Sequence, residues 1–228
     1  MSITENWLLP EGVDEVLPPE AARLEELRQE ILALCWRWGY ELVIPPLIEY
    51  LDSLLSGMGE DLDLQTFKLT DQLTGRTMGV RADITPQVAR IDARRLRREG
   101  VSRLCYLGPV LHTLPDRFSG SRNPLQLGAE LFGCEDPAAD VEIIMLMLDA
   151  IRLAGIEDIW LDLGHVGVFR SLADHLALDN AAEAAVFAAL QRKALPELER
   201  LLDTAGVDAA ARAWLVAVCE INGGLDAL

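Results

Sequence analysis

Two strand-like runs in the middle of the chain, joined by a long polar segment, constrain the fold more than any other feature. They are Leu104–Leu111 and Leu125–Phe132, and the segment between them is too long for a tight hairpin turn. Because side chains alternate between the two faces of a strand, Gln126, Gly128 and Glu130 share one face of the second run. An amide, a bare backbone and a carboxylate fixed on a strand predict the floor of a small-ligand site. The other face is apolar and is predicted to point into the core: Leu125, Leu127, Ala129 and Leu131.

A helix is predicted to start upstream of the first run, at Thr85, because a cap-type residue is followed there by Pro86. Val88 and Ile91 are expected to point inward from this helix. It closes with four arginines before Gly100: Arg94, Arg95, Arg97 and Arg98. They either contact phosphate or RNA, or complement the negative end of the helix dipole while their stems cover apolar surface. The second interpretation is favoured, because the dipole alone accounts for a cluster at a helix C-terminus.

The rest of the chain mixes helices and short strands up to about residue 166 and is helical afterwards. The predicted helices of the first part are Pro18–Trp38, Ile48–Ser56 and Pro137–Leu153. Its other predicted strands are Glu41–Ile44, Thr66–Thr70, Thr77–Val80 and Ile159–Leu163. Ala-rich helical segments follow at Asn180–Lys193, Pro196–Leu202 and Asp208–Cys219. The sequence therefore predicts an α+β protein with a sheet domain over residues 1–166, and a helical subdomain over 167–228 that packs against it.

Charge and cysteine placement exclude several classes of protein. The formal net charge of -17 argues against affinity for a nucleic-acid backbone, so no tRNA partner is expected. The cysteines lack CxxC spacing, so no metal site is expected, and their apolar surroundings predict buried thiols in a reducing compartment. They are Cys35, Cys105, Cys134 and Cys219. The N-terminus lacks a signal-peptide pattern and no apolar run approaches the roughly 20 residues that span a bilayer, so a cytoplasmic protein without a membrane partner is predicted.

The order of these pieces resembles the catalytic core of class II aminoacyl-tRNA synthetases and, within that class, the histidyl enzyme. Gly39–Tyr50 is similar to the motif-1 strand and its dimer-forming surroundings, and Arg81–Pro86 sits where the histidyl enzymes carry an Arg-Pro-Glu-Gly-Thr segment. Tyr106–Pro109 and Gln126–Gly133 resemble the two strands of motif 2. The resemblance covers residues 7–164 and implies an antiparallel sheet flanked by helices.

The chain departs from the synthetase pattern where the first motif-2 strand of that family ends in Phe-Arg-x-Glu. In the family the arginine grips the α-phosphate of ATP and the glutamate helps to hold the adenine, whereas this chain has His112 and Leu114. Histidine lacks the bidentate fork of arginine and is mostly neutral at pH 7, and leucine accepts no hydrogen bond. Loss of one such charge stabiliser typically costs about 10²–10³ in rate. The resemblance therefore implies a degenerate ATP site without catalytic residues, unless Arg117 or Arg122 replaces the missing arginine.

The amino-acid pocket of the histidyl enzymes is matched more closely. There an acid, a threonine and a glutamine hold the α-amino group, and a second-strand glutamate meets the imidazole. The matching positions, which the resemblance implies bind histidine, are Asp83, Thr85, Gln126 and Glu130. A carboxylate with neutral acceptors suits an ammonium group, and a second carboxylate suits an imidazole N–H. The alternative is a helix cap at Thr85 and a solvated strand face at Gln126 and Glu130.

This combination resembles the family of ATP phosphoribosyltransferase regulatory subunits, which are paralogues of histidyl-tRNA synthetase without an anticodon-binding domain. The resemblance implies no cofactor, a short-form catalytic subunit as partner in a hetero-oligomer, and L-histidine as the effector of feedback inhibition. It also implies that the helices after Val168 are that family's insertion. The motif-1 resemblance implies a two-fold homodimer with an apolar surface: Leu42, Ile44, Leu47 and Leu51.

Two alternatives stay open. One is a fragment of an active histidyl-tRNA synthetase, which needs the motif-2 arginine, a motif-3 segment and a basic tRNA-binding surface. The other is a ligase-like protein that transfers an aminoacyl adenylate to a different acceptor, and it too needs that arginine. Both activate an amino acid, so pyrophosphate exchange with ATP and histidine separates them from a regulatory subunit.

Overall fold

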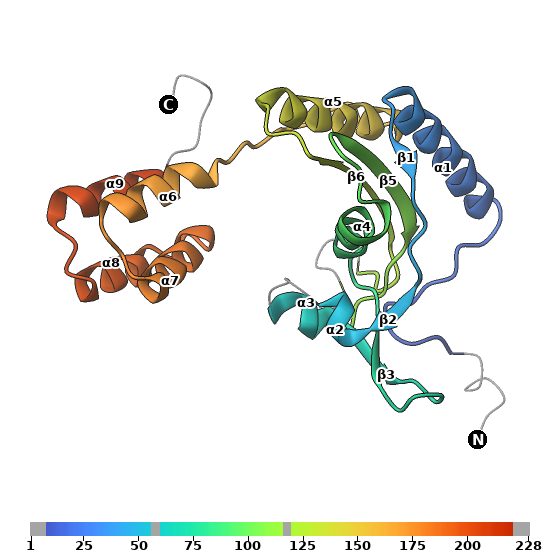
Figure 1. The fold of residues 1–228 in the computed structure, drawn as a ribbon, viewed down its shortest axis with the longest axis horizontal. Coiled ribbons are helices and arrows are strands. Elements are labelled where there is room, and N and C mark those ends of the chain that lie inside the picture. The colour runs from blue at the N-terminus through green and yellow to red at the C-terminus, as the bar shows by residue number, and fades with distance from the viewer. Residues whose placement is uncertain (1–7, 56–59, 116–119, 221–228) are drawn as a thin grey trace. The chain divides into compact units, whose positions relative to one another are not determined.

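The structure, a computed structural model, describes residues 8–55, 60–115 and 120–220 (Figure 1). The chain divides into two compact units, Met1–Ile159 and Trp160–Leu228, and each is described here by itself. The predicted domain division between residues 166 and 167 stays a prediction. In chain order the elements are α1 (Glu20–Arg37), β1 (Glu41–Leu42), β2 (Ile48–Tyr50), α2 (Leu51–Leu54), α3 (Glu60–Gln65), β3 (Phe67–Thr70), β4 (Thr77–Val80), α4 (Thr85–Ile91), the π-helical turn η2 (Asp92–Leu96), β5 (Ser102–Pro109), β6 (Leu125–Phe132), α5 (Pro137–Leu153), α6 (Val166–His175), α7 (Asn180–Gln191), α8 (Leu195–Thr204) and α9 (Ala209–Glu220).

The first unit is built on a three-stranded sheet in the order β1-β5-β6. β5 and β6 pair antiparallel along their whole length, from Ser102 opposite Phe132 to Pro109 opposite Leu125. β1 pairs with β5 in parallel, with Glu41 opposite Leu104. The α+β class and the long antiparallel pair are thus confirmed, and the one parallel strand is an addition to the predicted antiparallel sheet.

Helices cover both faces of this sheet, and the alternation along β5 decides which side chain meets which helix. On one face Cys105 packs with Ile31 of α1 and Leu146 of α5. On the other, Leu104 and Tyr106 belong to a core with Ile84 and Val88 around α4, which lies across the sheet in Figure 1. The predicted core face of β6 is only partly covered, because Leu125 and Leu127 are more than a third exposed.

A second small sheet, in the order β2-β4-β3, corrects one prediction. The stretch Ile48–Ser56 is predicted to be helical, but Ile48–Tyr50 forms β2, and of the described residues in this stretch only Leu51–Leu54 are helical. Ser56 lies outside the described residues. β2 pairs antiparallel with β4, and Ile48 lies opposite Val80. Tertiary pairing with β4 therefore overrides the local helical pattern. The predicted strands over residues 66–70 and 77–80 are confirmed as β3 and β4.

The predicted strand Ile159–Leu163 is wrong for the structure as described. These residues take no strand conformation, and the Trp160 side chain is 97% exposed. An alternating apolar pattern predicts a strand only where a free edge is available to pair with it, and no segment within residues 8–55, 60–115 or 120–220 pairs with this one. The prediction of buried thiols holds for Cys35 and Cys105 but not for Cys134, which is exposed. The Cys219 side chain lies outside the described part.

In its described residues, 160–220, the second unit is a bundle of four helices, α6 to α9. Its core brings together apolar residues of all four: Phe169, Ala173, Val186, Ala189, Leu198, Leu202, Val207, Ala211 and Leu215. The Asp179 carboxylate accepts a hydrogen bond from the backbone N–H of Ala182 at 2.8 Å and so caps α7. The helical segments predicted from the Ala-rich pattern are confirmed as α7, α8 and α9, and α6 adds a helix that the pattern did not predict. Packing of this unit against the sheet stays a prediction. Among the described residues no helix is both long and apolar enough to cross a bilayer.

A charged hydrogen-bond cluster ties α5 to the sheet. The Glu142 carboxylate of α5 accepts hydrogen bonds from the Tyr40 hydroxyl at 2.9 Å and from Nη2 of Arg103 at 2.8 Å. The Arg103 guanidinium lowers the pKa of Glu142, chiefly through hydrogen bonding. Because Tyr40 is buried at the end of α1 and Arg103 lies on β5, one carboxylate joins three elements.

Glu142→Gln is expected to lower the free energy of unfolding at pH 7 by about 1 kcal/mol, because it replaces charge-assisted hydrogen bonds and Arg103 is partly solvated. Since the folded pKa of Glu142 lies below its unfolded value of roughly 4.3, this contribution is present above that value and is lost as the pH falls through the folded pKa. Urea titrations at pH 7 and at pH 3.5 measure both effects, with Glu157→Gln as an exposed control. An equal deficit at both pH values would contradict the assignment.

Candidate functional site

The four residues predicted to hold a ligand come together on the α4 side of the main sheet. Gln126 bridges two of the segments: its Nε2 donates to Oδ1 of Asp83 at 2.7 Å, and its Oε1 accepts from the backbone N–H of Ile84 at 2.9 Å. Asp83 also accepts from the backbone N–H of Thr85 at 3.0 Å. The Asp83 side chain therefore fixes the start of α4, and Gln126 fixes that start to β6.

Tyr106 of β5 links the other two residues. Its hydroxyl lies 2.7 Å from Oγ1 of Thr85 and donates to Oε1 of Glu130 at 3.3 Å. The tyrosine is 2% exposed and sits directly opposite Gly128 in the β5–β6 ladder. The sequence interpretation assigned it no role in the site. The signal was present, because Tyr106 faces the glycine between Gln126 and Glu130, and a large side chain opposite a glycine can lie across it.

Two glycines make room for this arrangement. A Cβ atom on Gly128 would overlap the ring and hydroxyl of Tyr106. A Cβ atom on Gly108 would come within 2.7 Å of Nη2 of Arg81. Neither position requires a left-handed backbone, so each glycine is needed for close approach of a side chain and not for its dihedral angles.

Arg81 supports the segment that carries Asp83 and Thr85. It is buried, and it donates from Nε to the carbonyl of Pro109 at 2.9 Å and from Nη1 to the carbonyl of Pro45 at 2.8 Å. Burial lowers its pKa, yet a guanidinium keeps its charge at any physiological pH. The sequence interpretation missed this role too, because the partners are backbone carbonyls far away in the chain.

Burial sets the electrostatics of the pocket. It raises the pKa of Glu130, and the charge of Asp83 adds to that rise, while hydrogen bonding with Thr85 and Tyr106 opposes it. Burial also raises the pKa of Tyr106, so its hydroxyl keeps its proton at neutral pH. Two carboxylates and a hydroxyl in one half-buried place suit a ligand with a cationic group and a second N–H donor.

The two positions predicted to form a degenerate ATP site lie just beyond β5. The His112 ring is half-buried, and its Nε2 lies 2.9 Å from the carbonyl of Ala82. Leu114 is 71% exposed. Arg122, considered as a replacement for the missing arginine, donates to the carbonyls of His112 and Glu11, both at 3.1 Å. Its guanidinium thus has structural partners, and Arg117 lies outside the described residues.

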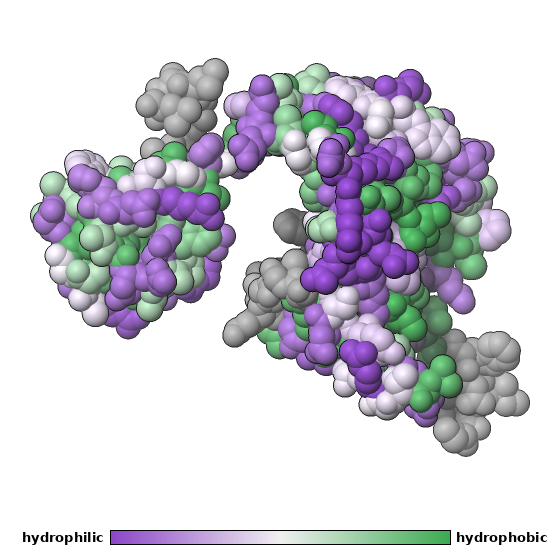
Figure 2. Space-filling model, viewed as in Figure 1, coloured by the Kyte–Doolittle hydropathy of each residue, from purple (hydrophilic) through white to green (hydrophobic). Residues whose placement is uncertain are grey.

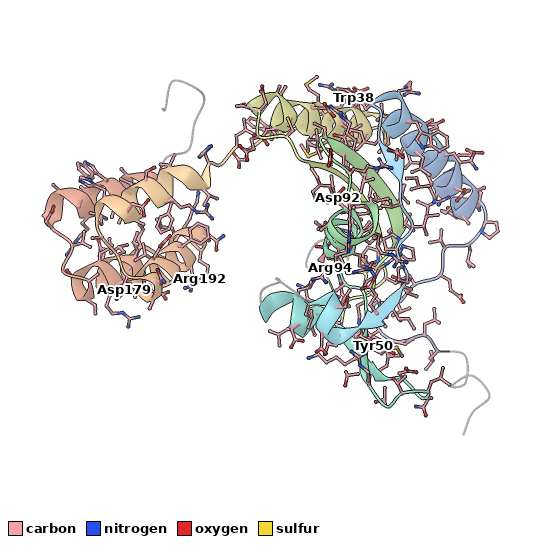
Figure 3. The ribbon with its side chains drawn as sticks, viewed as in Figure 1. Trp38, Tyr50, Asp92, Arg94, Asp179 and Arg192 are labelled. Atoms are coloured by element: carbon pink, nitrogen blue, oxygen red, sulfur yellow. The ribbon has the colours of Figure 1, made fainter. Side chains whose placement is uncertain are left out.

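The arginine cluster after α4 has protein partners as well. Arg98 forms an ion pair with Glu41, and Nε of Arg97 donates to the carbonyl of Arg94 at 3.0 Å. The hydrophilic colour gathers over α4 and η2 in Figure 2, and Arg94 and Asp92 are labelled on η2 in Figure 3. These contacts favour the dipole and packing interpretation over a phosphate site.

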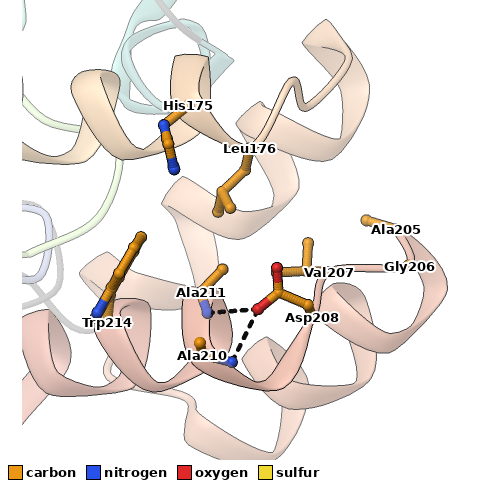
Figure 4. Close-up of a pocket in the computed structure, with 9 residues that line it drawn as sticks. All are labelled: His175, Leu176, Ala205, Gly206, Val207, Asp208, Ala210, Ala211 and Trp214. Atoms are coloured by element: carbon orange, nitrogen blue, oxygen red, sulfur yellow. Dashed lines mark hydrogen bonds between the residues drawn. The ribbon is translucent and has the colours of Figure 1, made fainter.

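The helical unit has its own hollow of about 260 Å³, which Figure 4 shows. His175 and Trp214 face one another across it with ring centroids 5.8 Å apart. The Asp208 carboxylate beside them caps α9 through the backbone N–H groups of Ala210 and Ala211, both at 2.9 Å. The Asp208 carboxylate is therefore engaged by the start of its own helix. Among the described residues no group of His, Cys, Asp or Glu side chains is placed to hold a metal ion.

Comparison with known sequences identifies close relatives. A family model described as histidyl-tRNA synthetase matches residues 12–228. The ATP phosphoribosyltransferase regulatory subunit of Alkalilimnicola ehrlichii is 62% identical over 97% of this chain and 55% of that protein. The subunit of the same name from Pseudomonas aeruginosa is 57% identical over 100% of this chain and 57% of that protein. The chain thus spans a little over half the length of these curated relatives.

Solved structures match the fold. An ATP phosphoribosyltransferase regulatory subunit/histidyl-tRNA synthetase from Bacillus halodurans superposes with a TM-score of 0.84 at 26% identity, covering 100% of this chain and 59% of that one. Histidyl-tRNA synthetase from Nostoc reaches a TM-score of 0.75 at 16% identity, covering 97% of this chain and 50% of that one. The second likeness shows the class II synthetase fold alone.

Glu130→Gln is expected to raise the free energy of unfolding at pH 7.5 by about 0.5–1 kcal/mol, because it removes a carboxylate whose charge burial disfavours. The folded pKa of Glu130 lies above its unfolded value, so wild type loses stability as the pH rises through the folded pKa. The advantage of the variant should therefore shrink as the pH is lowered from 8 to 5. Urea titrations across this range measure it, with the exposed Glu99→Gln as control. A variant less stable than wild type at pH 7.5 would show that Glu130 is a structural group.

Proposed function

The chain belongs to the histidyl-tRNA synthetase family, and from that premise we propose that it is the synthetase-like part of an ATP phosphoribosyltransferase regulatory subunit that binds L-histidine without activating it. The relatives that carry this regulatory name are 57–62% identical to the chain. The proposal assigns the protein to the first step of histidine biosynthesis as a non-catalytic subunit in the cytoplasm.

The observation that carries the proposal is the half-buried, hydrogen-bonded cluster with a carboxylate near each end. Asp83 and Thr85 at the start of α4 suit the α-ammonium group of histidine, and Glu130 suits the imidazole N–H. Gln126 holds Asp83 in place at 2.7 Å. Hydrogen bonds to charged groups contribute about 1.5–3 kcal/mol each, so two such contacts supply roughly 3–6 kcal/mol of a micromolar affinity of about 8 kcal/mol.

The absence of catalysis rests on the positions beyond β5. In the family that the chain resembles, an arginine and a glutamate at the positions of His112 and Leu114 engage ATP. The His112 ring contacts the Ala82 carbonyl, and Leu114 offers no acceptor. Arg122 is held by two carbonyls, which supports the view that it does not take over the phosphate contact.

Partners follow from the same proposal. A short-form ATP phosphoribosyltransferase catalytic subunit is the expected partner, within a hetero-oligomer that contains a two-fold dimer of this protein. Ile44 is 81% exposed and Leu47 about half exposed, which supports an apolar interface at the segment before β2, whereas Leu42 and Leu51 are partly covered. Light scattering of the full-length protein measures the dimer directly.

The second candidate is part of an active histidyl-tRNA synthetase, and the description of the matching family model favours it. Pyrophosphate exchange with ATP and histidine separates the two. We expect no exchange above background in the full-length protein, because the charge stabiliser for the α-phosphate is missing. Pyrophosphate exchange at the rate of an authentic synthetase would contradict the regulatory assignment.

The regulatory proposal predicts how turnover of the catalytic subunit responds to histidine. The full-length protein should show no turnover alone and should raise the turnover of a short-form catalytic subunit from the same organism. Asp83→Asn combined with Glu130→Gln should leave this activation in place and shift half-maximal inhibition to at least tenfold more histidine. Both changes keep the side-chain shape and remove only the charges that recognise the ligand.

A matched control carries the same charge changes away from the site, at the exposed Asp158 and Glu157. Asp158→Asn with Glu157→Gln should leave the inhibition curve unchanged. Identical curves for wild type and the site variant would place the feedback site on the other subunit. Failure of the wild-type protein to activate the catalytic subunit would reject the regulatory role itself.

A further inference from the structure

Three hydrogen-bonded oxygen atoms form a row between the two ends of the site. Oγ1 of Thr85 lies 2.7 Å from the Tyr106 hydroxyl, and that hydroxyl lies 3.3 Å from Oε1 of Glu130. Thr85 belongs to the end proposed to receive the ammonium group, and Glu130 to the end proposed to receive the imidazole. Tyr106 thus links these two ends of the site, beside the hydrogen bond that Thr85 itself makes with Glu130.

The chemistry of the three groups decides which oxygen donates its proton to which. An ionised carboxylate only accepts hydrogen bonds, and a phenol has one proton to donate. When Glu130 is ionised, the Tyr106 proton therefore points to it, and the Tyr106 oxygen accepts the proton of the Thr85 hydroxyl. The remaining lone pairs of Thr85 are then available to accept a hydrogen bond from a ligand.

The opposite direction is unfavourable for a cationic ligand. If Tyr106 donated to Thr85, its oxygen lone pairs would face the Glu130 carboxylate, and the Thr85 proton would be free to point into the pocket. An ammonium group offers only donors, so it would meet a donor there. The direction from Thr85 through Tyr106 to Glu130 leaves both lone pairs of Thr85 for the ligand and turns its proton away, whereas the opposite direction leaves one lone pair.

We propose that Tyr106 is a positioning residue that fixes Thr85 as a hydrogen-bond acceptor for the α-ammonium group of histidine, an inference that rests on the proposed function. Its placement requires Gly128, since any side chain there would overlap the tyrosine ring. The Tyr106 ring belongs to the same core as Ile84 and Val88. Tyr106 acts through Thr85 and has no direct contact with the ligand in this proposal.

The test measures how much the amine contributes to binding. Calorimetry on the full-length protein gives the affinity ratio of L-histidine to imidazolepropionate, which keeps the ring and the carboxylate but lacks the amine. Tyr106→Phe should lower this ratio at least fivefold, and so should Thr85→Val. In the double variant the two losses should not add, because both remove the same acceptor.

Tyr40→Phe is the matched control. Tyr40 is another buried tyrosine whose hydroxyl donates to a glutamate, Glu142, outside the site, and its loss should leave the ratio unchanged. Glu130→Leu is a second probe that keeps Tyr106 in place. It frees the Tyr106 proton to point at Thr85 and should lower the amine contribution, although Glu130 lies at the imidazole end.

The outcomes separate the inference from the proposed function. A wild-type protein that binds no histidine rejects both. A wild-type protein that binds histidine, with an unchanged ratio in Tyr106→Phe, rejects the inference alone. If Tyr106→Phe does not fold, Glu130→Leu decides: an unchanged ratio overturns the inference and a fall of at least fivefold supports it. Additive losses in the double variant with Thr85→Val would also overturn it.

Discussion

The antiparallel ladder between β5 and β6 positions Tyr106, Gln126 and Glu130, and Gln126 in turn holds Asp83 at the start of α4. Its register places Tyr106 opposite Gly128, so the tyrosine can cross to the neighbouring strand and reach Glu130. A shift of one residue would move Gln126 and Glu130 to the α1 side and bring leucines to the pocket. The register is held by the cores on both faces, because Leu104 and Cys105 are buried on opposite sides. The core packing that holds the register of the sheet therefore also fixes the geometry of the site.

The pocket combines groups that do not favour the folded state when no ligand is present. Burial disfavours the Glu130 charge, and the nearby Asp83 charge adds to this cost. The Arg81 guanidinium is engaged elsewhere, because its Nε and Nη1 atoms donate to the carbonyls of Pro109 and Pro45. A cationic ligand would supply the missing counter-charge, which fits a sensor whose pocket is prepared for binding and not for its own stability.

Sequence patterns with a fixed period predicted the parts of the site that lie on regular elements. The two-residue period of β6 placed Gln126 and Glu130 on one face. The Thr85-Pro86 pair placed the start of α4, but the prediction of Thr85 as the cap residue is wrong, because Ile84 is the N-cap and Thr85 is the first helical residue. The supporting role of Arg81 was not predicted, because its partners are backbone carbonyls and a pattern of side chains does not reveal them. The strand predicted over Ile159–Leu163 is wrong. A strand needs the edge of a neighbouring strand to pair with, and the alternation within one segment does not show whether such an edge is present.

Recognition and activation occupy different structural elements, which gives a physical reason why one can be kept while the other is lost. The proposed histidine contacts lie on the start of α4 and within the paired length of β5 and β6. The positions that engage ATP in the resembled enzymes lie past Pro109, beyond the paired strands, where the His112 backbone N–H donates to the Arg122 carbonyl at 2.8 Å and His112 forms an isolated bridge with Thr66. A substitution there leaves the register of Tyr106 and Gly128 untouched. His112 even supports the pocket, because its ring contacts the carbonyl of Ala82, next to Asp83. On the proposed function, His112 stands where the resembled enzymes carry the phosphate-binding arginine, and here it supports the segment that holds the amino-acid site.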